Sequence, residues 1–227
     1  MAHLSEARAR FAMTSKTTQC WSCGKEHAAS DALCPHCGKV QPVPAQKALE
    51  DTVADKFATL GFARSYDLHP GKVEEAFKSL SRKLHPDRFA RASAQERRFS
   101  LEQTTLLNDA YRTLKDPVRR AEHLLELRGV KMGEGSKVEL PPEFLEQALE
   151  DREKLLEAKG GGEPQAVEVL AREVQGRRDA TLTHIAQQLR ALESGSQTDL
   201  APVAQLISQL RYYARYLDEV EGRPAGP

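Results

Sequence analysis

The chain has 227 residues, of which 33 are basic and 33 acidic, so its formal net charge is zero. A neutral chain gives no bulk-charge argument for binding nucleic acid or a membrane surface. Helix-forming residues are abundant, aromatic residues make up 6% of the chain, and long stretches with strand-like alternation are missing. We predict an all-α protein of one or two domains with one small metal-binding module.

Neither a membrane helix nor a secretory signal is predicted. The chain has no run of about 18 consecutive apolar residues. Residues 1–13 contain arginine but lack the apolar centre of a secretory signal. We predict disordered tails at residues 1–19 and 222–227. The expected location is the bacterial cytoplasm, and the mitochondrial matrix is the less favoured alternative.

The four cysteines of the chain follow the spacing C-x2-C-x10-C-x2-C at Cys20, Cys23, Cys34 and Cys37. Gly and Lys follow each pair, so the two halves repeat each other. Gly24 and Gly38 can adopt the positive φ that lets backbone N–H groups approach thiolates. We predict one structural zinc ion, held by four sulfurs with no open position for catalysis. Iron, two disulfides and a redox-active dithiol are the alternatives.

The metal module and a proline-containing linker are predicted to occupy residues 20–45, with the linker running from Gln41 to Ala45. A helix is expected next, over residues 49–60, and its inward-facing residues are Val53, Phe57 and Leu60.

Two amphipathic segments flank the tripeptide His85-Pro86-Asp87. The first has apolar residues at helical spacing up to Leu84 and these basic residues on its other face: Lys72, Lys78, Arg82 and Lys83. The second extends over residues 94–114. Pro86 disfavours the α region for His85, so the first helix is expected to end there. We predict an antiparallel helical hairpin with the tripeptide exposed at its tip. No nucleophile or second acid lies beside the tripeptide, so we expect it to dock on a protein and not to catalyse a reaction.

A further helix is predicted to start at Asp116-Pro117, and a polar connection follows it. Beyond the connection, three helical patterns with short links predict an antiparallel three-helix bundle. The core face of the last helix is predicted to carry Leu200, Val203, Ile207, Leu210, Ala214 and Leu217. The predicted hairpin domain, linker and bundle therefore occupy residues 46–130, 131–142 and 143–221.

The bundle segments carry more apolar residues than one core needs. Tyr212, Tyr213 and Tyr216 form a second stripe on the last helix, and the first helix has surplus leucines. An exposed patch for a partner protein and a second buried face are equally favoured by this pattern. The first bundle helix is also acidic, which suggests a second partner surface: Glu146, Glu150, Asp151, Glu153 and Glu157.

Two sequence runs carry a family resemblance. F-K-S-L-S-R-K-L-H-P-D-R-F, followed by L-N-D-A-Y-R-T-L-K-D-P, resembles a J-domain. An acidic three-helix bundle comes next, with the runs F-L-E-Q-A-L-E-D-R-E-K-L and Q-L-R-Y-Y, and this order resembles the HscB group. The four-cysteine N-terminus is similar to that of eukaryotic members. The predicted fold is therefore a J-domain hairpin, a C-terminal three-helix bundle and a small N-terminal zinc-knuckle module.

The resemblance implies a co-chaperone and not an enzyme. Such proteins bind an IscU-like iron–sulfur cluster scaffold and stimulate the ATPase of an HscA-like, DnaK-type chaperone. Carried over by position, the chaperone-binding residues are His85, Pro86, Asp87, Lys78, Arg82, Lys83 and Arg88. The scaffold-binding residues are Leu145, Leu149, Glu150, Glu153 and Tyr212. Two residues depart from the family pattern: Glu146 replaces a large apolar residue, and Lys56 replaces an aromatic one.

Two other functions fit the same sequence. One is a J-domain co-chaperone for a different client. The other is a zinc- or redox-sensing protein that carries a J-domain. Self-association is a further prediction, and neither nucleic acid nor a membrane is expected as a partner.

Overall fold

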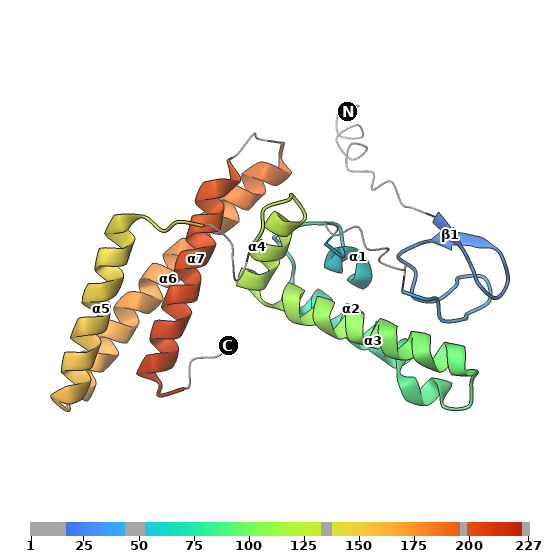
Figure 1. The fold of residues 1–227 in the computed structure, drawn as a ribbon, viewed down its shortest axis with the longest axis horizontal. Coiled ribbons are helices and arrows are strands. Elements are labelled where there is room, and N and C mark those ends of the chain that lie inside the picture. Colours follow the sequence, from blue (N-terminus) through green and yellow to red (C-terminus); the bar gives the residue numbers. More distant parts are fainter. Residues whose placement is uncertain (1–16, 44–52, 133–137, 196–198, 224–227) are drawn as a thin grey trace. The chain divides into compact units, whose positions relative to one another are not determined.

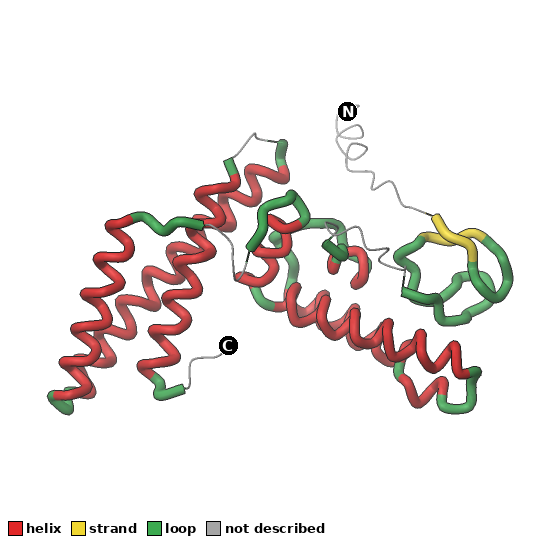
Figure 2. The backbone as a smooth tube through the Cα atoms, in the orientation of Figure 1, coloured by secondary structure: helices red, strands yellow, loops and turns green. Residues whose placement is uncertain are grey.

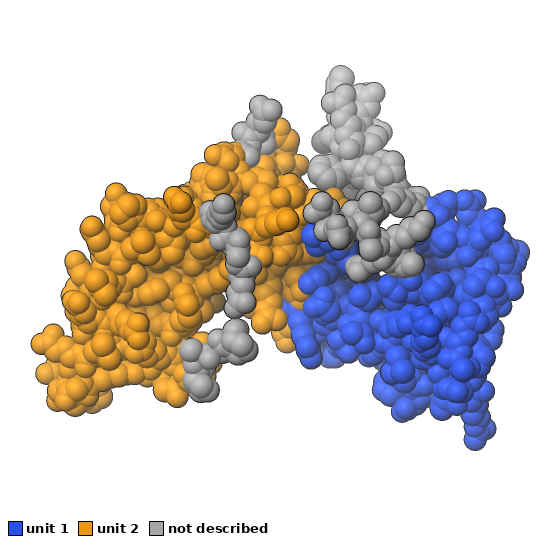
Figure 3. All heavy atoms as spheres, in the orientation of Figure 1, with its two compact units in different colours: residues 1–63, 69–112 blue, residues 64–68, 113–227 orange. Residues whose placement is uncertain are grey.

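The structure is a computed structural model that describes residues 17–43, 53–132, 138–195 and 199–223. This part of the chain contains seven α-helices, one short 3-10 helix and a two-stranded sheet (Figures 1 and 2). The predicted all-α class with a small N-terminal module is confirmed. The chain divides into two compact units, residues 1–63 with 69–112 and residues 64–68 with 113–227 (Figure 3). Within the described ranges, every helix is too short or too polar to span a bilayer.

The metal module begins earlier in the chain than the sequence suggested. Strand β1 (Thr17–Gln19) pairs antiparallel with β2 (Glu26–Ala28), and the first cysteine pair lies in the turn between them. The predicted tail at residues 1–19 is therefore wrong for its last three residues. Residues 1–16 and 224–227 lie outside the described residues. Gln41, predicted to be in a linker, is 3% exposed and belongs to the module.

Helix α1 (Lys56–Leu60) is shorter than the expected helix over residues 49–60. Asp55 caps it by accepting hydrogen bonds from two backbone N–H groups, so the helix cannot extend further back. Val53 precedes the cap and is exposed, whereas Phe57 and Leu60 are buried as predicted. Residues 49–52 lie outside the described residues.

Helices α2 (Pro70–Leu84) and α3 (Ala94–Lys115) form the predicted antiparallel hairpin. Near its base, the rings of Phe77 and Tyr111 stack with centroids 4.1 Å apart. At the base, Lys56 of α1 forms an ion pair with Asp109 of α3 at 3.1 Å. His69 caps α2 by accepting the N–H of Gly71.

The second unit contains the predicted bundle and one more helix. Helices α5 (Pro142–Gly160) and α7 (Leu200–Val220) both pack against α6 (Pro164–Glu193). Helix α4 (Pro117–Glu126), assigned from sequence to the hairpin domain, packs against α6 and α7. Its apolar face supplies Ala121, Leu124 and Leu125 to this core, and Glu122 pairs with Arg211 of α7 at 2.7 Å.

The core face of α7 includes two of the three tyrosines. Val203, Ile207 and Leu210 are buried as predicted, and the buried face continues through Tyr213 and Tyr216. Ala214 and Leu217, which are predicted on this face, are not buried: Ala214 is exposed and Leu217 is only partly buried. For Tyr213 and Tyr216 the buried alternative is therefore correct.

Candidate functional site

The tripeptide His85-Pro86-Asp87 lies in the turn between α2 and α3. His85 has an extended backbone and ends α2, and Pro86 begins a 3-10 turn (Pro86–Phe89). The side chains of His85 and Asp87 are 54% and 90% exposed. The His85 Nδ1 atom accepts the N–H of Asp87 at 3.3 Å, so the proton of a neutral ring is on Nε2. The loop therefore presents an imidazole donor and a carboxylate acceptor to a partner.

Two hydroxyl groups of α3 fix the position of this loop. Ser100 Oγ donates to the backbone oxygen of Leu84 at 2.6 Å, and Thr104 Oγ1 donates to the same oxygen at 3.2 Å. Leu84 is buried and directly precedes His85. A carbonyl at a helix C-terminus lacks a partner within the helix, so these bonds supply what the helix cannot. They hold the start of the tripeptide against α3.

Basic side chains surround the loop. Arg82, Lys83 and Arg88 are exposed and form no ion pair among the described residues. Lys78 forms an ion pair with Glu74 one turn earlier at 2.6 Å, and this contact raises the pKa of Lys78. Exposed, unpaired cations beside a docking loop favour association with an acidic partner surface.

The four predicted metal ligands meet at one point of the module. Their sulfur atoms all lie within 4.8 Å of one another, with 3.6 Å between Cys20 and Cys37 and 3.8 Å between Cys23 and Cys34. Sulfurs bound tetrahedrally to zinc at about 2.3 Å are about 3.8 Å apart, so the cluster has the size of a zinc site. Gly24 and Gly38 have φ of 71° and 72°, as predicted.

The electrostatics of the cluster also fit a bound cation. Burial opposes ionisation of Cys20, but the N–H groups of Cys23 and Ser22 outweigh it and lower the pKa of Cys20 to about 6. A hydrogen bond from the backbone of Lys39 favours the thiolate form of Cys37. Burial and the neighbouring cysteine sulfurs outweigh this bond and raise the pKa of Cys37 to about 12. Four neighbouring thiolates would repel one another, which disfavours the ionisation of all four. A bound divalent cation would offset this repulsion. When bound, the ion would hold the two turns together as a structural centre.

A buried glutamine and a buried histidine support the cluster. The Gln41 side chain donates to Cys20 Sγ at 3.4 Å and to the Lys39 backbone oxygen at 2.8 Å. Its side-chain oxygen lies 3.2 Å from Nε2 of His27, whose Nδ1 is 2.8 Å from the Ala28 oxygen. Both nitrogens of His27 are therefore engaged by oxygen atoms, and His27 is not a ligand.

The predicted scaffold-binding leucines lie on the outer face of α5. Leu145 and Leu149 are 52% and 61% exposed, and Leu156, two turns later, is 55% exposed. Acidic residues share this face, namely Glu146, Glu150 and Glu153. Asp151, predicted to belong to the acidic surface, is 4% exposed and pairs with Arg177 of α6 at 2.8 Å. The face therefore combines exposed leucines with negative charge.

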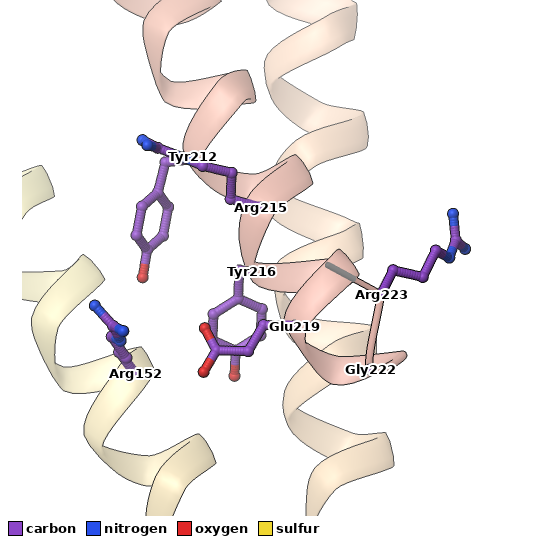
Figure 4. A pocket seen from close by; sticks show the side chains of 7 residues that line it. All are labelled: Arg152, Tyr212, Arg215, Tyr216, Glu219, Gly222 and Arg223. Carbon is purple, nitrogen blue, oxygen red and sulfur yellow. The ribbon is translucent and has the colours of Figure 1, made fainter. Parts of the chain in front are cut away.

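Tyr212 lies between α5 and α7 and is only partly accessible. Its hydroxyl donates to the backbone oxygen of Ala148 on α5, and burial raises its pKa to about 12. Figure 4 shows Tyr212 reaching from α7 towards Arg152 on α5, along a cleft of about 670 Å³. The Tyr216 hydroxyl borders this cleft and has no hydrogen-bond partner among the described residues.

Comparison with known proteins identifies the family. Residues 140–221 match the model of the HSCB C-terminal oligomerisation domain, and residues 16–41 match a zinc-ribbon domain. A co-chaperone protein HscB homolog from Ralstonia nicotianae is 36% identical over 156 residues, which cover 69% of this chain and 86% of that protein. The chain belongs to the HscB co-chaperone family. The predicted resemblance to HscB is therefore confirmed.

Other HscB proteins match more of the chain. The iron-sulfur cluster co-chaperone protein HscB of Mus musculus is 29% identical over 206 residues, which cover 89% of this chain and 81% of that protein. The crystal structure of human co-chaperone protein HscB superimposes with a TM-score of 0.74 at 27% identity. That alignment covers 90% of this chain and 97% of the human one. The HscB fold thus extends over most of this chain.

Several polar residues that hold the loop and the cysteine cluster in place were not predicted from the sequence. Ser100 and Thr104 hold the loop, Gln41 contacts the cysteines, and Gln103 donates to the Gln41 backbone oxygen at 3.1 Å. The sequence offered one signal for these residues, namely polar side chains at inward-facing positions of α3. A buried polar group needs a hydrogen-bond partner, so such a position indicates a contact.

Proposed function

We propose that this HscB protein holds an iron–sulfur scaffold protein on α5 while the tripeptide docks on a DnaK-type ATPase. The observation that carries the proposal is the loop geometry: His85 and Asp87 are exposed, and the carbonyl before them is fixed by two hydrogen bonds. A preorganised loop loses little conformational freedom on binding. Docking favours the hydrolysis-competent state of the ATPase if the loop binds that state more tightly.

The α5 face supports the second half of the proposal. Its exposed leucines Leu145 and Leu149 form an apolar surface beside Glu146, Glu150 and Glu153, with the exposed Arg152 one turn after Leu149, and such a mixture is typical of a protein-binding patch. The scaffold's own surface would then be apolar with basic groups at its edge. The predicted contacts Leu145, Leu149, Glu150 and Glu153 all lie on this exposed side of α5. Glu146 lies among them, so binding should weaken as salt rises.

We infer that the metal in the four-cysteine cluster is one zinc ion. The sulfur separations and the closed four-thiolate set support this identity. Metal analysis of protein purified without added metal tests it, and one equivalent of iron would refute it. Self-association through the C-terminal domain stays a prediction, tested by sedimentation at several concentrations.

The chain contains a matched control for testing the loop. His69-Pro70 repeats the His-Pro pair of the tripeptide, and each histidine accepts the backbone N–H two residues later. We expect His85→Gln to abolish stimulation of a DnaK-type ATPase, while helix content and scaffold affinity stay unchanged. His69→Gln should keep full stimulation. Normal stimulation by the His85 variant would refute the docking proposal, and failure to bind an iron–sulfur scaffold would favour a different client.

A further inference from the structure

The first turns of α3 contact two functional elements at once. One face of these turns contacts the metal module, through Glu96, Phe99 and Gln103. The adjacent face holds the tripeptide loop, through Ser100 and Thr104. The first set is spaced i, i+3, i+7 and the second i, i+4, so each forms one row along the helix. Phe99 precedes Ser100 and Gln103 precedes Thr104, so the two rows are direct neighbours.

The contacts with the metal module are specific, and their α3 residues are buried, whereas Lys39 and Trp21 of the module are partly exposed. Lys39 Nζ lies 2.9 Å from Glu96 Oε1, and Glu96 is 7% exposed. The hydrogen bond from Lys39 lowers the pKa of Glu96, so the carboxylate stays ionised at neutral pH. The ring of Trp21 meets Phe99 edge-on at 6.0 Å between centroids. Gln103, itself 7% exposed, donates to the Gln41 backbone oxygen at 3.1 Å.

These contacts depend on the cysteine cluster. Lys39 follows Cys37 by two residues, and Trp21 lies between the first two cysteines. Gln41 bonds to Cys20 Sγ through its side chain and to α3 through its backbone. A four-cysteine module of this size folds only with its metal, so metal loss would remove all three contacts together.

We propose that the metal module braces the first turns of α3 and so positions the tripeptide loop, with Lys39, Trp21 and Gln41 as positioning residues. The effect of the module on ATPase stimulation rests on the proposed docking function. The stabilisation of α3 by the module does not depend on that function. Helix ends open locally more easily than helix centres, and the brace suppresses this opening. While these turns are closed, Ser100 and Thr104 keep the Leu84 carbonyl in place, and the loop is ready to bind.

The repeat within the module supplies a matched control. Lys25 follows Cys23 as Lys39 follows Cys37, but Lys25 is exposed and forms no ion pair among the described residues. The variants are Lys39→Gln, Gln103→Leu and the control Lys25→Gln. Glu96→Gln changes the other residue of the Lys39–Glu96 ion pair, because it removes the negative charge and keeps the side-chain shape beside Ser93.

Amide hydrogen exchange of the full chain is measured at residues 97–104, with zinc bound and after chelation. We expect Gln103→Leu to speed exchange about fivefold, the factor for losing one buried hydrogen bond. Lys39→Gln should speed exchange about twofold, because the lysine side chain of this ion pair is 43% exposed and solvent weakens the pair. Both variants should keep their zinc, and Lys25→Gln should match the wild type. Chelation should speed wild-type exchange at least as much, and Lys39→Gln should then have no further effect. Equal exchange rates with and without zinc would refute the brace.

The second measurement is ATPase stimulation of a DnaK-type chaperone. We expect the half-maximal concentration to rise at least about threefold for the zinc-free protein, because losing all three contacts together leaves a smaller share of molecules with the loop in place, and to rise less for Lys39→Gln. Scaffold affinity, which depends on α5, should not change. Faster exchange with unchanged stimulation would refute the positioning role. If the wild type gives no stimulation, the proposed function fails, and the exchange result still decides whether the brace exists.

Discussion

Replacing Leu149 by alanine separates binding from stability on α5. The side chain of Leu149 is 61% exposed, so a bound partner can still bury most of it. Full burial of a leucine side chain contributes about 1.5–3 kcal/mol, so covering the exposed part contributes about 1–2 kcal/mol. That loss corresponds to a roughly 5- to 30-fold weaker scaffold affinity. The fold should lose only about 0.6–1.2 kcal/mol, the share that the already buried part of Leu149 contributes on the same scale.

The assay is titration of an iron–sulfur scaffold protein with each variant, together with thermal unfolding of each variant alone. Leu155→Ala is the matched control on the same helix. Leu155 is 0% exposed, so its truncation should cost about 2–5 kcal/mol of stability through the cavity it leaves. Leu149→Ala should instead unfold at nearly the wild-type temperature.

Leu156→Ala tests how far the contact surface extends. Leu156 is 55% exposed but lies outside the predicted set of contacts, so its truncation should leave affinity unchanged. Wild-type affinity for Leu149→Ala would refute the assignment of this face. A large fall in the unfolding temperature of that variant would refute the reasoning from exposure.

Three further predictions concern stability and the metal. Gly176→Ala should stabilise α6 by about 0.5–1 kcal/mol in chemical denaturation, because a Cβ there meets no atom within 4 Å and glycine disfavours helix; lower stability would refute this. Asp151→Ala should destabilise the bundle by about 2 kcal/mol, because it leaves Arg177 without its buried partner, and Asp151→Asn should cost less; equal losses would show that charge is irrelevant. Chelating the metal should shift the fluorescence of Trp21, the single tryptophan, to longer wavelength, because its bond to the Val40 oxygen at 2.7 Å breaks; an unchanged spectrum would contradict a metal-dependent fold.

Much of each site followed from short-range patterns. The cysteine spacing with Gly24 and Gly38 predicted a four-sulfur cluster, because both turns are local structures with a required backbone conformation. Pro86 predicted the end of α2 at Leu84, because proline restricts the residue before it. Asp116 before Pro117 predicted the start of α4 in the same way.

Residues whose role depends on distant partners were missed or misplaced. Asp151 was counted as a surface charge, but its partner on α6 is 26 positions away and buries it. Tyr213 and Tyr216 fitted either a core or a surface, and the packing of α7 against the other helices made them core. Gln41 was assigned to a linker, because local sequence patterns do not show its contact with Gln103, which lies 62 residues away.

The sequence alone thus determined most of the helices, the exposed tripeptide and the four-cysteine cluster, since each depends on residues a few positions apart. Tertiary structure decided which helix faces are buried and which polar groups fix the loop and the cluster. Periodicity gives the faces of a helix but not their neighbours, and only packing pairs Ser100 with the Leu84 carbonyl or Lys39 with Glu96.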